Sequence, residues 1–402
     1  MKNRTSVNAA EYRKFKIFGL SIELRRRGLL ADIKRFYQKR TTMPLYDQVL
    51  NNDALVNKLI PFNAKGSAKC SGGNFDFNAL FKDIKFIARE DKNTPLNYIF
   101  IWGMGYHPIH KAILKDAKKY KAIVNTWEDG FIRSADTPAN SRNMEAKYLQ
   151  SVSCAIDDMS AYFDAQRASR LECMLNDSNL VITEEQKQRA RTLIKKITDN
   201  YLSKYNHQPI FTPNIGRQGK KKILVVDQSF GDMSVTRGMA DEKTFEIMLT
   251  QAIEENPDAD ILVKTHPDTL AGSSMCYYLK VKQEGNIFTL REPINPISLI
   301  KYVDKVYVCT TQFGMEALLC GKEVHTFGMP FYAGWGLTTD FLKCSRRTNK
   351  RTVEELFYIA YVLYTHYINP ETKTQCEIEE AINYLLKIRE EYFTKFNIRK
   401  DI

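Results

Sequence analysis

The chain alternates short apolar runs with longer segments in which apolar residues recur at helical spacing. The short runs are continuous in apolar residues, which is typical of parallel strands that are buried on both faces. The segments between them have one apolar face and one charged face, as helices on a sheet do. This order predicts repeated strand–helix–strand units and therefore an α/β protein. The predicted strands lie at residues 98–102, 122–125, 223–227, 260–263 and 305–308.

A segment rich in Pro, Gly and Lys, residues 206–222 (NHQPIFTPNIGRQGKKK), interrupts this pattern. Such a shift in composition is typical of a linker, and 402 residues are enough for two or three domains with cores of their own. We expect two Rossmann-like domains, residues 1–215, which begin with a basic helical extension, and residues 216–370. The last helix, in residues 371–402, is expected to pack back on the first domain.

The net charge and the cysteines indicate which partners and which cellular compartment to expect. The formal net charge is +12, and the pI near 9.1 favours an anionic partner, such as a nucleotide, nucleic acid, anionic polysaccharide or membrane surface. The eight cysteines lack zinc-like spacing, and we expect them to be reduced. No apolar run has the length of a membrane span, so a cytoplasmic protein is expected. The basic segment 11–40 either contacts anionic lipid or, as its helical periodicity favours, packs on its own domain.

Polar residues follow three of the predicted strands in the second half of the chain. Because the carboxyl ends of parallel strands meet at one edge of a sheet, these residues are expected to line one cleft. Hydroxyl groups at the start of a helix, here near residues 310–314, are typical of an anion site. The polar residues are Asp227, Gln228 and Ser229 after one strand, Lys264 and His266 after another, and Thr310, Thr311 and Gln312 after the third.

Two further motifs carry candidate chemistry. The sequence EDGFIRS, residues 128–134, follows a predicted strand, so Glu128 and Asp129 are candidate acid or base groups. A simple chain reversal at Asp129-Gly130 explains the motif equally well. The second motif, PFYAGWG in residues 330–336, contains Tyr332 and Trp335 and predicts either a wall of the site or a packed aromatic turn.

Together these motifs resemble the KpsC-type capsule polysaccharide β-Kdo transferases. The similarity covers residues 98 to about 340 and rests on EDGFIRS, the DQS of residues 227–229, the KTHP of residues 264–267 and the loop FYAGWGLTTD of residues 331–340. The resemblance implies a GT-B-like glycosyltransferase, in which two Rossmann-like domains face a cleft. It also implies a cytoplasmic enzyme of bacterial surface polysaccharide biosynthesis. Family members often carry two such modules in tandem, whereas this chain has room for one.

The resemblance also assigns roles to individual residues. Asp227 matches the nucleophile of a retaining transfer from CMP-Kdo, which passes through a covalent Kdo–aspartate intermediate. Glu128 matches the acid/base carboxylate, and His266 matches a histidine that contacts the donor phosphate. The remaining donor-binding candidates are Lys264, Ser229, Gln228, Thr310, Thr311, Gln312, Glu316, Arg133, Asp129, Tyr332 and Trp335. Among these, Arg133 either pairs with the carboxylate of the donor sugar or holds the EDG turn.

The expected partners are CMP-Kdo and a glycan or glycolipid acceptor, with no nucleic acid. No cofactor or metal is expected, because CMP is a good leaving group when cationic and hydrogen-bonding groups neutralise its phosphate. Peripheral contact with the inner membrane or with capsule-assembly proteins stays open. Two other functions remain in competition: an inverting sialyltransferase-like enzyme that uses CMP-sialic acid, and a non-catalytic binding protein of capsule assembly.

Overall fold

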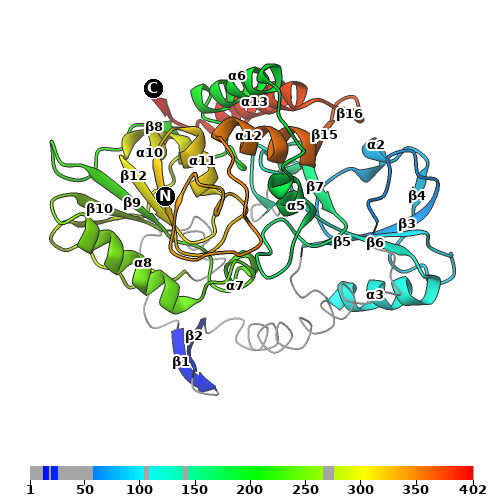
Figure 1. The fold of residues 1–402 in the computed structure, drawn as a ribbon, viewed down its shortest axis with the longest axis horizontal. Coiled ribbons are helices and arrows are strands. Elements are labelled where there is room, and N and C mark those ends of the chain that lie inside the picture. Colours follow the sequence, from blue (N-terminus) through cyan, green and yellow to red (C-terminus); the bar gives the residue numbers. More distant parts are fainter. Residues whose placement is uncertain are drawn as a thin grey trace.

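The computed structural model describes residues 12–17, 20–25, 58–103, 108–138, 144–265 and 276–401. In the first two segments it describes the backbone, which forms a hairpin of the antiparallel strands β1 (Tyr12–Ile17) and β2 (Leu20–Arg25). The rest forms two lobes side by side, each built on one sheet (Figure 1). The helix expected in the basic segment 11–40 is therefore wrong for residues 12–17 and 20–25, which are strands. Its two possible roles, lipid contact and packing on its own domain, depend on side chains that are not among the described residues.

The first lobe has a seven-stranded sheet in the order β16-β15-β7-β6-β5-β3-β4. Strands β3 to β6 are parallel, whereas β7, β15 and β16 pair antiparallel with their neighbours. The strands are β3 (Gly66–Ser71), β4 (Ile84–Phe86), β5 (Tyr98–Trp102), β6 (Ile123–Asp129), β7 (Ser153–Asp157), β15 (Thr365–Asn369) and β16 (Thr374–Cys376).

The second lobe has a six-stranded sheet in which every pairing is parallel. Its strands are β9 (Lys222–Val226), β10 (Asp260–Lys264), β11 (Ile287–Leu290), β12 (Lys305–Val308), β13 (Glu323–Thr326) and β14 (Thr339–Asp340). Their order, β11-β10-β9-β12-β13-β14, is 3-2-1-4-5-6 when they are numbered from β9. This is the doubly wound Rossmann order, which reverses between β9 and β12 and leaves a crevice beyond their carboxyl ends.

Helices cover both sheets, and several of them begin at good capping residues. Thr183 and Asp241 form capping boxes at the starts of the two helices that follow them, α6 and α8. The longer helices are α3 (Pro108–Tyr120), α6 (Glu184–Asp199), α8 (Glu242–Glu255) and α13 (Ile378–Phe396). The shorter ones are α2 (Phe77–Leu80), α4 (Ala146–Leu149), α5 (Arg170–Asn176), α7 (Met233–Arg237), α10 (Pro296–Tyr302), α11 (Phe313–Leu319) and α12 (Val353–Phe357). Among the described residues, none of these helices combines the length and the apolar character that a membrane span needs.

The chain returns to the first lobe before its last helix. After α12, the π-helix η3 (Tyr358–Tyr364) leads into β15, which pairs with β7 of the first sheet. The apolar run of η3 explains this path, because Tyr361 stacks on Phe131 of the first lobe with ring centroids 4.7 Å apart. The range 216–370, which was expected to form the second domain, therefore includes a strand of the first sheet.

The last helix, α13, lies beside α6 along one edge of the molecule (Figure 1). Arg189 of α6 donates to Glu379 across a 2.8 Å contact, and Lys196 donates to Asn383 at 2.6 Å. Beyond α13, the short strand β17 (Lys400–Asp401) pairs with β8 (Ile210–Phe211), which precedes the second sheet. The C-terminal segment thus contacts the first lobe and the connection between the lobes.

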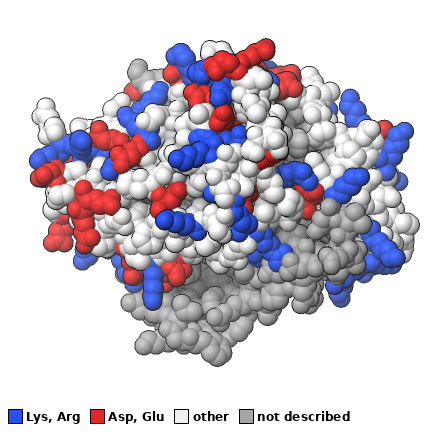
Figure 2. Space-filling model, in the orientation of Figure 1, with Lys and Arg blue, Asp and Glu red and all other residues white. Residues whose placement is uncertain are grey.

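The basic segment 343–351 joins the two lobes. Arg346 and Arg347 both contact the Glu172 carboxylate of α5, at 2.6 Å and 2.9 Å. Arg347 also donates to the carbonyl oxygens of Pro330 and Ala333, in the aromatic loop of the second lobe. Over the rest of the face drawn in Figure 2, lysines and arginines are interspersed with acidic residues. Of the cations in residues 343–351, Arg347 and Arg351 are buried, whereas Lys343, Arg346 and Lys350 are exposed.

We predict that Glu172→Ala destabilises the protein by about 3 kcal/mol, because it leaves the buried Arg347 guanidinium without its carboxylate partner. The melting temperature, measured by circular dichroism, should fall by several degrees. Glu185→Ala is the matched control, since Glu185 is exposed in the first turn of α6. Equal melting temperatures for the two variants would contradict the role of this contact.

Candidate active site

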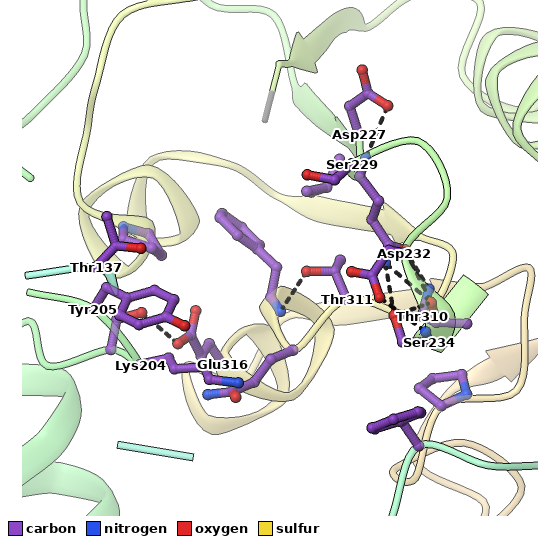
Figure 3. A pocket seen from close by; sticks show the side chains of 18 of the residues that line it. Thr137, Lys204, Tyr205, Asp227, Ser229, Asp232, Ser234, Thr310, Thr311 and Glu316 are labelled. Atoms are coloured by element: carbon purple, nitrogen blue, oxygen red, sulfur yellow. Dashed lines mark hydrogen bonds between the residues drawn. The ribbon is translucent and has the colours of Figure 1, made fainter. Parts of the chain in front are cut away.

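A cavity of about 690 Å³ lies between the two sheets and is lined by residues of both lobes. The second lobe contributes the ends of β9, β10 and β12, as the reversal of strand order requires. Figure 3 shows Lys204, Tyr205 and Glu316 together on one side and Asp232, Ser234 and Thr310 on the other. The predicted site residues that line the cavity are Glu128, Asp227, Gln228, Ser229, Lys264, Thr310, Thr311, Gln312 and Glu316.

Asp227 stands directly after β9 and is fixed by backbone groups. Its Oδ1 accepts hydrogen bonds from the N–H groups of Gln228 and Tyr277, at 2.8 and 3.0 Å, and its Oδ2 accepts one from Tyr278 at 3.0 Å. Burial raises the pKa of the Asp227 carboxyl above its ordinary value, although these hydrogen bonds act in the opposite direction. The carboxylate is therefore held in one orientation at the cavity wall.

Gln228 connects the ends of the two central strands. Its Oε1 accepts from the backbone N–H of Thr310 at 2.8 Å, and its Nε2 donates to the Thr310 hydroxyl at 3.1 Å. Because β9 and β12 are neighbours in the sheet, this side chain spans the point where the strand order reverses. Gln228 thus sets the position of the Thr310 hydroxyl relative to Asp227.

Lys264 and Gln312 line the cavity but also have protein partners. The Lys264 ammonium donates to the carbonyl oxygens of Glu292 and Thr265, at 3.0 and 3.3 Å, and burial lowers the pKa of Lys264 to about 8. Gln312 donates through Nε2 to the carbonyl oxygen of Phe131 in the first lobe at 2.7 Å. Both contacts give these side chains a structural role in addition to any role toward a ligand.

Glu128, at the end of β6, is the acidic group that the first lobe presents to the cavity. Its Oε1 accepts from the indole Nε1 of Trp102 at 3.1 Å and from the backbone N–H of Asp129 at 3.0 Å. Burial raises the pKa of Glu128 to about 7, with a further increase from the neighbouring Asp129 carboxylate, while the Lys204 ammonium opposes the shift. A carboxyl with this pKa exchanges a proton near neutral pH, which suits general base catalysis.

Glu316, on α11, also faces the cavity from the second lobe. Its Oε1 accepts a hydrogen bond from the Ser203 hydroxyl of the first lobe at 2.6 Å. Burial raises the pKa of Glu316 to about 7. This carboxyl therefore joins α11 to the loop that follows α6.

Asp129 and Arg133 lie beside the cavity and are not part of its lining. Their side chains pair with each other at 2.8 Å, and both are buried. Arg133 also donates to the Ser134 hydroxyl at 2.8 Å and to the carbonyl oxygen of Leu149 at 2.9 Å. Of the two roles considered for Arg133, these contacts correspond to holding the turn of EDGFIRS.

Tyr332 and Trp335 support the cavity wall from behind. The Tyr332 hydroxyl donates to the carbonyl oxygen of Thr311 at 2.6 Å, and Trp335 donates to the carbonyl oxygen of Phe331 at 2.8 Å. A Cβ atom at Gly314 would lie 2.3 Å from the Tyr332 hydroxyl oxygen, so glycine is needed there. Both aromatic side chains are fully buried, and Phe331 is the aromatic residue of this loop that lines the cavity.

This geometry can be compared with that of known proteins. Residues 185–371 match the family described as capsule polysaccharide biosynthesis protein. The structure of Thermosulfurimonas dismutans KpsC, beta Kdo 2,4 transferase, is 35% identical in sequence with a TM-score of 0.68, and the match covers 77% of this chain and 93% of that one. The chain belongs to the KpsC-type capsule polysaccharide biosynthesis family. The resemblance drawn from the four motifs and the predicted GT-B-like fold class are both confirmed.

Two further relatives agree with this assignment. The T. dismutans KpsC, beta Kdo 2,7 transferase, is 25% identical with a TM-score of 0.55, covering 81% of this chain and 100% of that one. The capsule polysaccharide modification protein LipA of Neisseria meningitidis serogroup A is 38% identical over 296 residues, or 71% of this chain. The chain spans 41% of the length of LipA.

Sequence reasoning missed several cavity residues of this KpsC-type chain. Residues 203–205 (SKY) lie between α6 and the linker at residues 206–222, and no strand end or motif marks them as part of the site. Tyr162 and Asp232 were also missed, because each lies in a loop without a recognisable motif. The missed polar or aromatic residues include Tyr162, Ser203, Lys204, Tyr205, His207, Asp232 and Ser234.

Two predictions about this site remain predictions. His266 lies outside the described residues, so its expected contact with the donor phosphate is not examined by the structure. The described part of the chain contains no group of three or more His, Cys, Asp or Glu side chains arranged to hold a metal ion. The expectation that no metal or cofactor takes part is not tested by that observation.

We predict that Tyr332→Phe lowers the free energy of unfolding by about 1–3 kcal/mol, because it removes the buried hydrogen bond to the Thr311 carbonyl. Tyr120→Phe is the matched control, since the Tyr120 hydroxyl donates to the carbonyl oxygen of Lys92 near the surface, where water replaces it. Thermal melts of both variants test the difference. A larger loss of stability in Tyr120→Phe would overturn the supporting role of Tyr332.

Proposed function

We propose that this protein is a retaining β-Kdo transferase that moves Kdo from CMP-Kdo to a glycan or glycolipid acceptor. The observation that carries the proposal is one cavity lined by Asp227 from the second lobe and Glu128 from the first. Two carboxylates in one site, one fixed and one titrating near neutral pH, are the groups that a two-step transfer with retention requires. The similarity to the two KpsC transferases supports Kdo as the sugar.

In the proposed first step, an oxygen of Asp227 attacks the anomeric carbon of Kdo as its bond to the CMP phosphate breaks. CMP leaves with the bonding electron pair, and Kdo is joined to Asp227 as an ester. The ammonium of Lys264 and the hydroxyl groups of Thr310 and Thr311 are the cavity groups suited to the departing phosphate. The helix α11 has only seven residues, so its dipole contributes less than these groups.

In the proposed second step, the acceptor hydroxyl attacks the same carbon from the face that CMP has left. Glu128 takes the hydroxyl proton, the bond to Asp227 breaks, and the Asp227 carboxylate is restored. Two displacements at one carbon give overall retention. The Trp102 and Asp129 hydrogen bonds hold Oε1 of Glu128, which orients the carboxyl toward the cavity.

The first test uses the purified protein with CMP-Kdo or with CMP-sialic acid, measuring CMP release and the intact mass of the protein. We expect release with CMP-Kdo and a mass increase of one Kdo residue, which Asp227→Ala and Asp227→Asn both lose. Affinity for CMP in both variants serves as the control for folding. Release with CMP-sialic acid alone would instead favour the sialyltransferase-like enzyme, and no release with any acceptor would favour a non-catalytic binding protein.

The pH dependence of transfer tests the role of Glu128. A general base acts in its deprotonated form, so the rate of transfer should rise as the pH increases through about 7 and level off above it. Glu128→Gln should lower transfer by about 10²- to 10⁴-fold and leave affinity for CMP-Kdo nearly unchanged. The rise near pH 7 should disappear in this variant. If Glu128→Gln keeps the rise, another group, such as Glu316, is the titrating one.

A further inference from the structure

CMP-Kdo carries a carboxylate on its sugar, and the proposed function therefore requires a cationic or hydrogen-bonding site for that group. Arg133 was the residue considered for it, but Arg133 is buried outside the cavity and paired with Asp129. We propose that Lys204 binds the sugar carboxylate, together with the hydroxyl groups of Tyr162 and Tyr205. This inference rests on the proposed function and names the subsite that would select a 2-keto sugar acid.

Lys204 presents a cation to the cavity, where Glu128, Asp129 and Glu316 act on it electrostatically but no described carboxylate forms an ion pair with it. Its side chain is partly buried and lines the cavity beside Tyr205 and Glu316 (Figure 3). Its Nζ makes no hydrogen bond or ion pair with another residue in the described ranges, and it lies 5.9 Å from the centre of the Tyr205 ring. An ammonium group that is partly withdrawn from water and makes no direct contact with a carboxylate can still accept an anionic ligand, so this position favours one.

The two tyrosines supply hydroxyl donors at the same wall. The Tyr162 ring is fixed between Phe131 and Phe331, with centroid distances of 5.0 and 5.8 Å. Within the part of the chain that the structure describes, neither the Tyr162 nor the Tyr205 hydroxyl has a hydrogen-bond partner. Burial raises the pKa of both phenols, so they remain protonated donors at neutral pH. An ammonium and two hydroxyls match the acceptor oxygens of one carboxylate.

The EDGFIRS turn holds this subsite in place. The backbone N–H groups of Arg133 and Ser134 donate to the carbonyl oxygen of Lys204, at 3.1 and 3.3 Å. The Arg133 guanidinium also lies 5.7 Å from the centre of the Tyr205 ring. Arg133 therefore acts on the subsite as a positioning residue. Lys264, the other lysine of the cavity, already donates to two carbonyl oxygens.

The charge state of Lys204 agrees with this role. Burial alone would lower the pKa of its ammonium, but Tyr162, Tyr205, Glu128 and Asp129 together raise that pKa above its ordinary value. Lys204 is therefore a cation throughout the neutral range. The same positive charge also lowers the pKa of Glu128, and this could be the whole role of Lys204. The experiment therefore measures donor binding separately from the pH dependence of transfer.

The test compares the affinities of wild type and Lys204→Gln for CMP-Kdo and for CMP, measured by isothermal titration calorimetry. CMP has the nucleotide and phosphate but no sugar carboxylate. We expect Lys204→Gln to weaken CMP-Kdo binding about 10- to 100-fold, the effect of losing a charge-assisted hydrogen bond, and to leave CMP binding unchanged. Lys204→Arg should retain most of the affinity, and Tyr162→Phe and Tyr205→Phe should each weaken CMP-Kdo binding several-fold.

Lys195→Gln is the matched control, because Lys195 is exposed on α6, a short distance before Lys204 in the chain. Equal weakening of CMP and CMP-Kdo in Lys204→Gln would overturn the proposal and assign Lys204 to the phosphate. Unchanged CMP-Kdo binding, with only a shifted pH profile of transfer, would also overturn it. If the wild-type protein releases no CMP from CMP-Kdo, the proposed function fails. If the wild-type protein does release CMP and Lys204→Gln binds CMP-Kdo as tightly as the wild type, only the carboxylate subsite is wrong.

Discussion

The contact of the buried Glu172 carboxylate with Arg346 and with the buried Arg347 is the interaction on which the site geometry depends. The carboxylate belongs to α5 of the first lobe, and Arg347 continues to the carbonyl oxygens of Pro330 and Ala333 in the second. Because a buried ion pair loses much of its free energy when it separates, this contact resists a change in the distance between the lobes. Glu128 and Asp227 come from different lobes, so a shared site requires such a constraint.

A second constraint acts within the second lobe. The reversal of strand order leaves a crevice beside the end of β9, and Gln228 fixes the hydroxyl of Thr310 across it. The Tyr332 hydroxyl donates a hydrogen bond to the carbonyl oxygen of Thr311, the residue after Thr310, on the side away from the cavity. Polar groups around the proposed phosphate position are thus oriented before any ligand arrives, which is the condition for electrostatic stabilisation of a leaving group.

The sequence predicted the α/β class and the clustering of Asp227, Lys264 and Thr310, because continuous apolar strands and their polar ends are local signals. It could not predict the return of β15 to the first sheet, since pairing between β7 and β15 depends on the packing of η3 against Phe131. The sequence also left open which of two contacts Arg133 makes, and it did not mark Lys204 as a residue of the cavity. Whether an arginine after a strand faces the cavity or its own turn depends on Asp129 and Leu149, which only the folded chain brings into contact with it.

The charges around the cavity also bear on the order of the proposed steps. In the proposed function, CMP-Kdo would bring negative charge near Glu128, and a negative neighbour raises the pKa of a carboxyl group. While the donor is bound, Glu128 would then be more protonated than in the free protein. Departure of CMP removes part of that charge and lowers the pKa of Glu128 again. The base would then be restored after the Kdo–Asp227 ester has formed, when the acceptor hydroxyl has a proton to give, so the donor's own charge would keep the two steps in sequence.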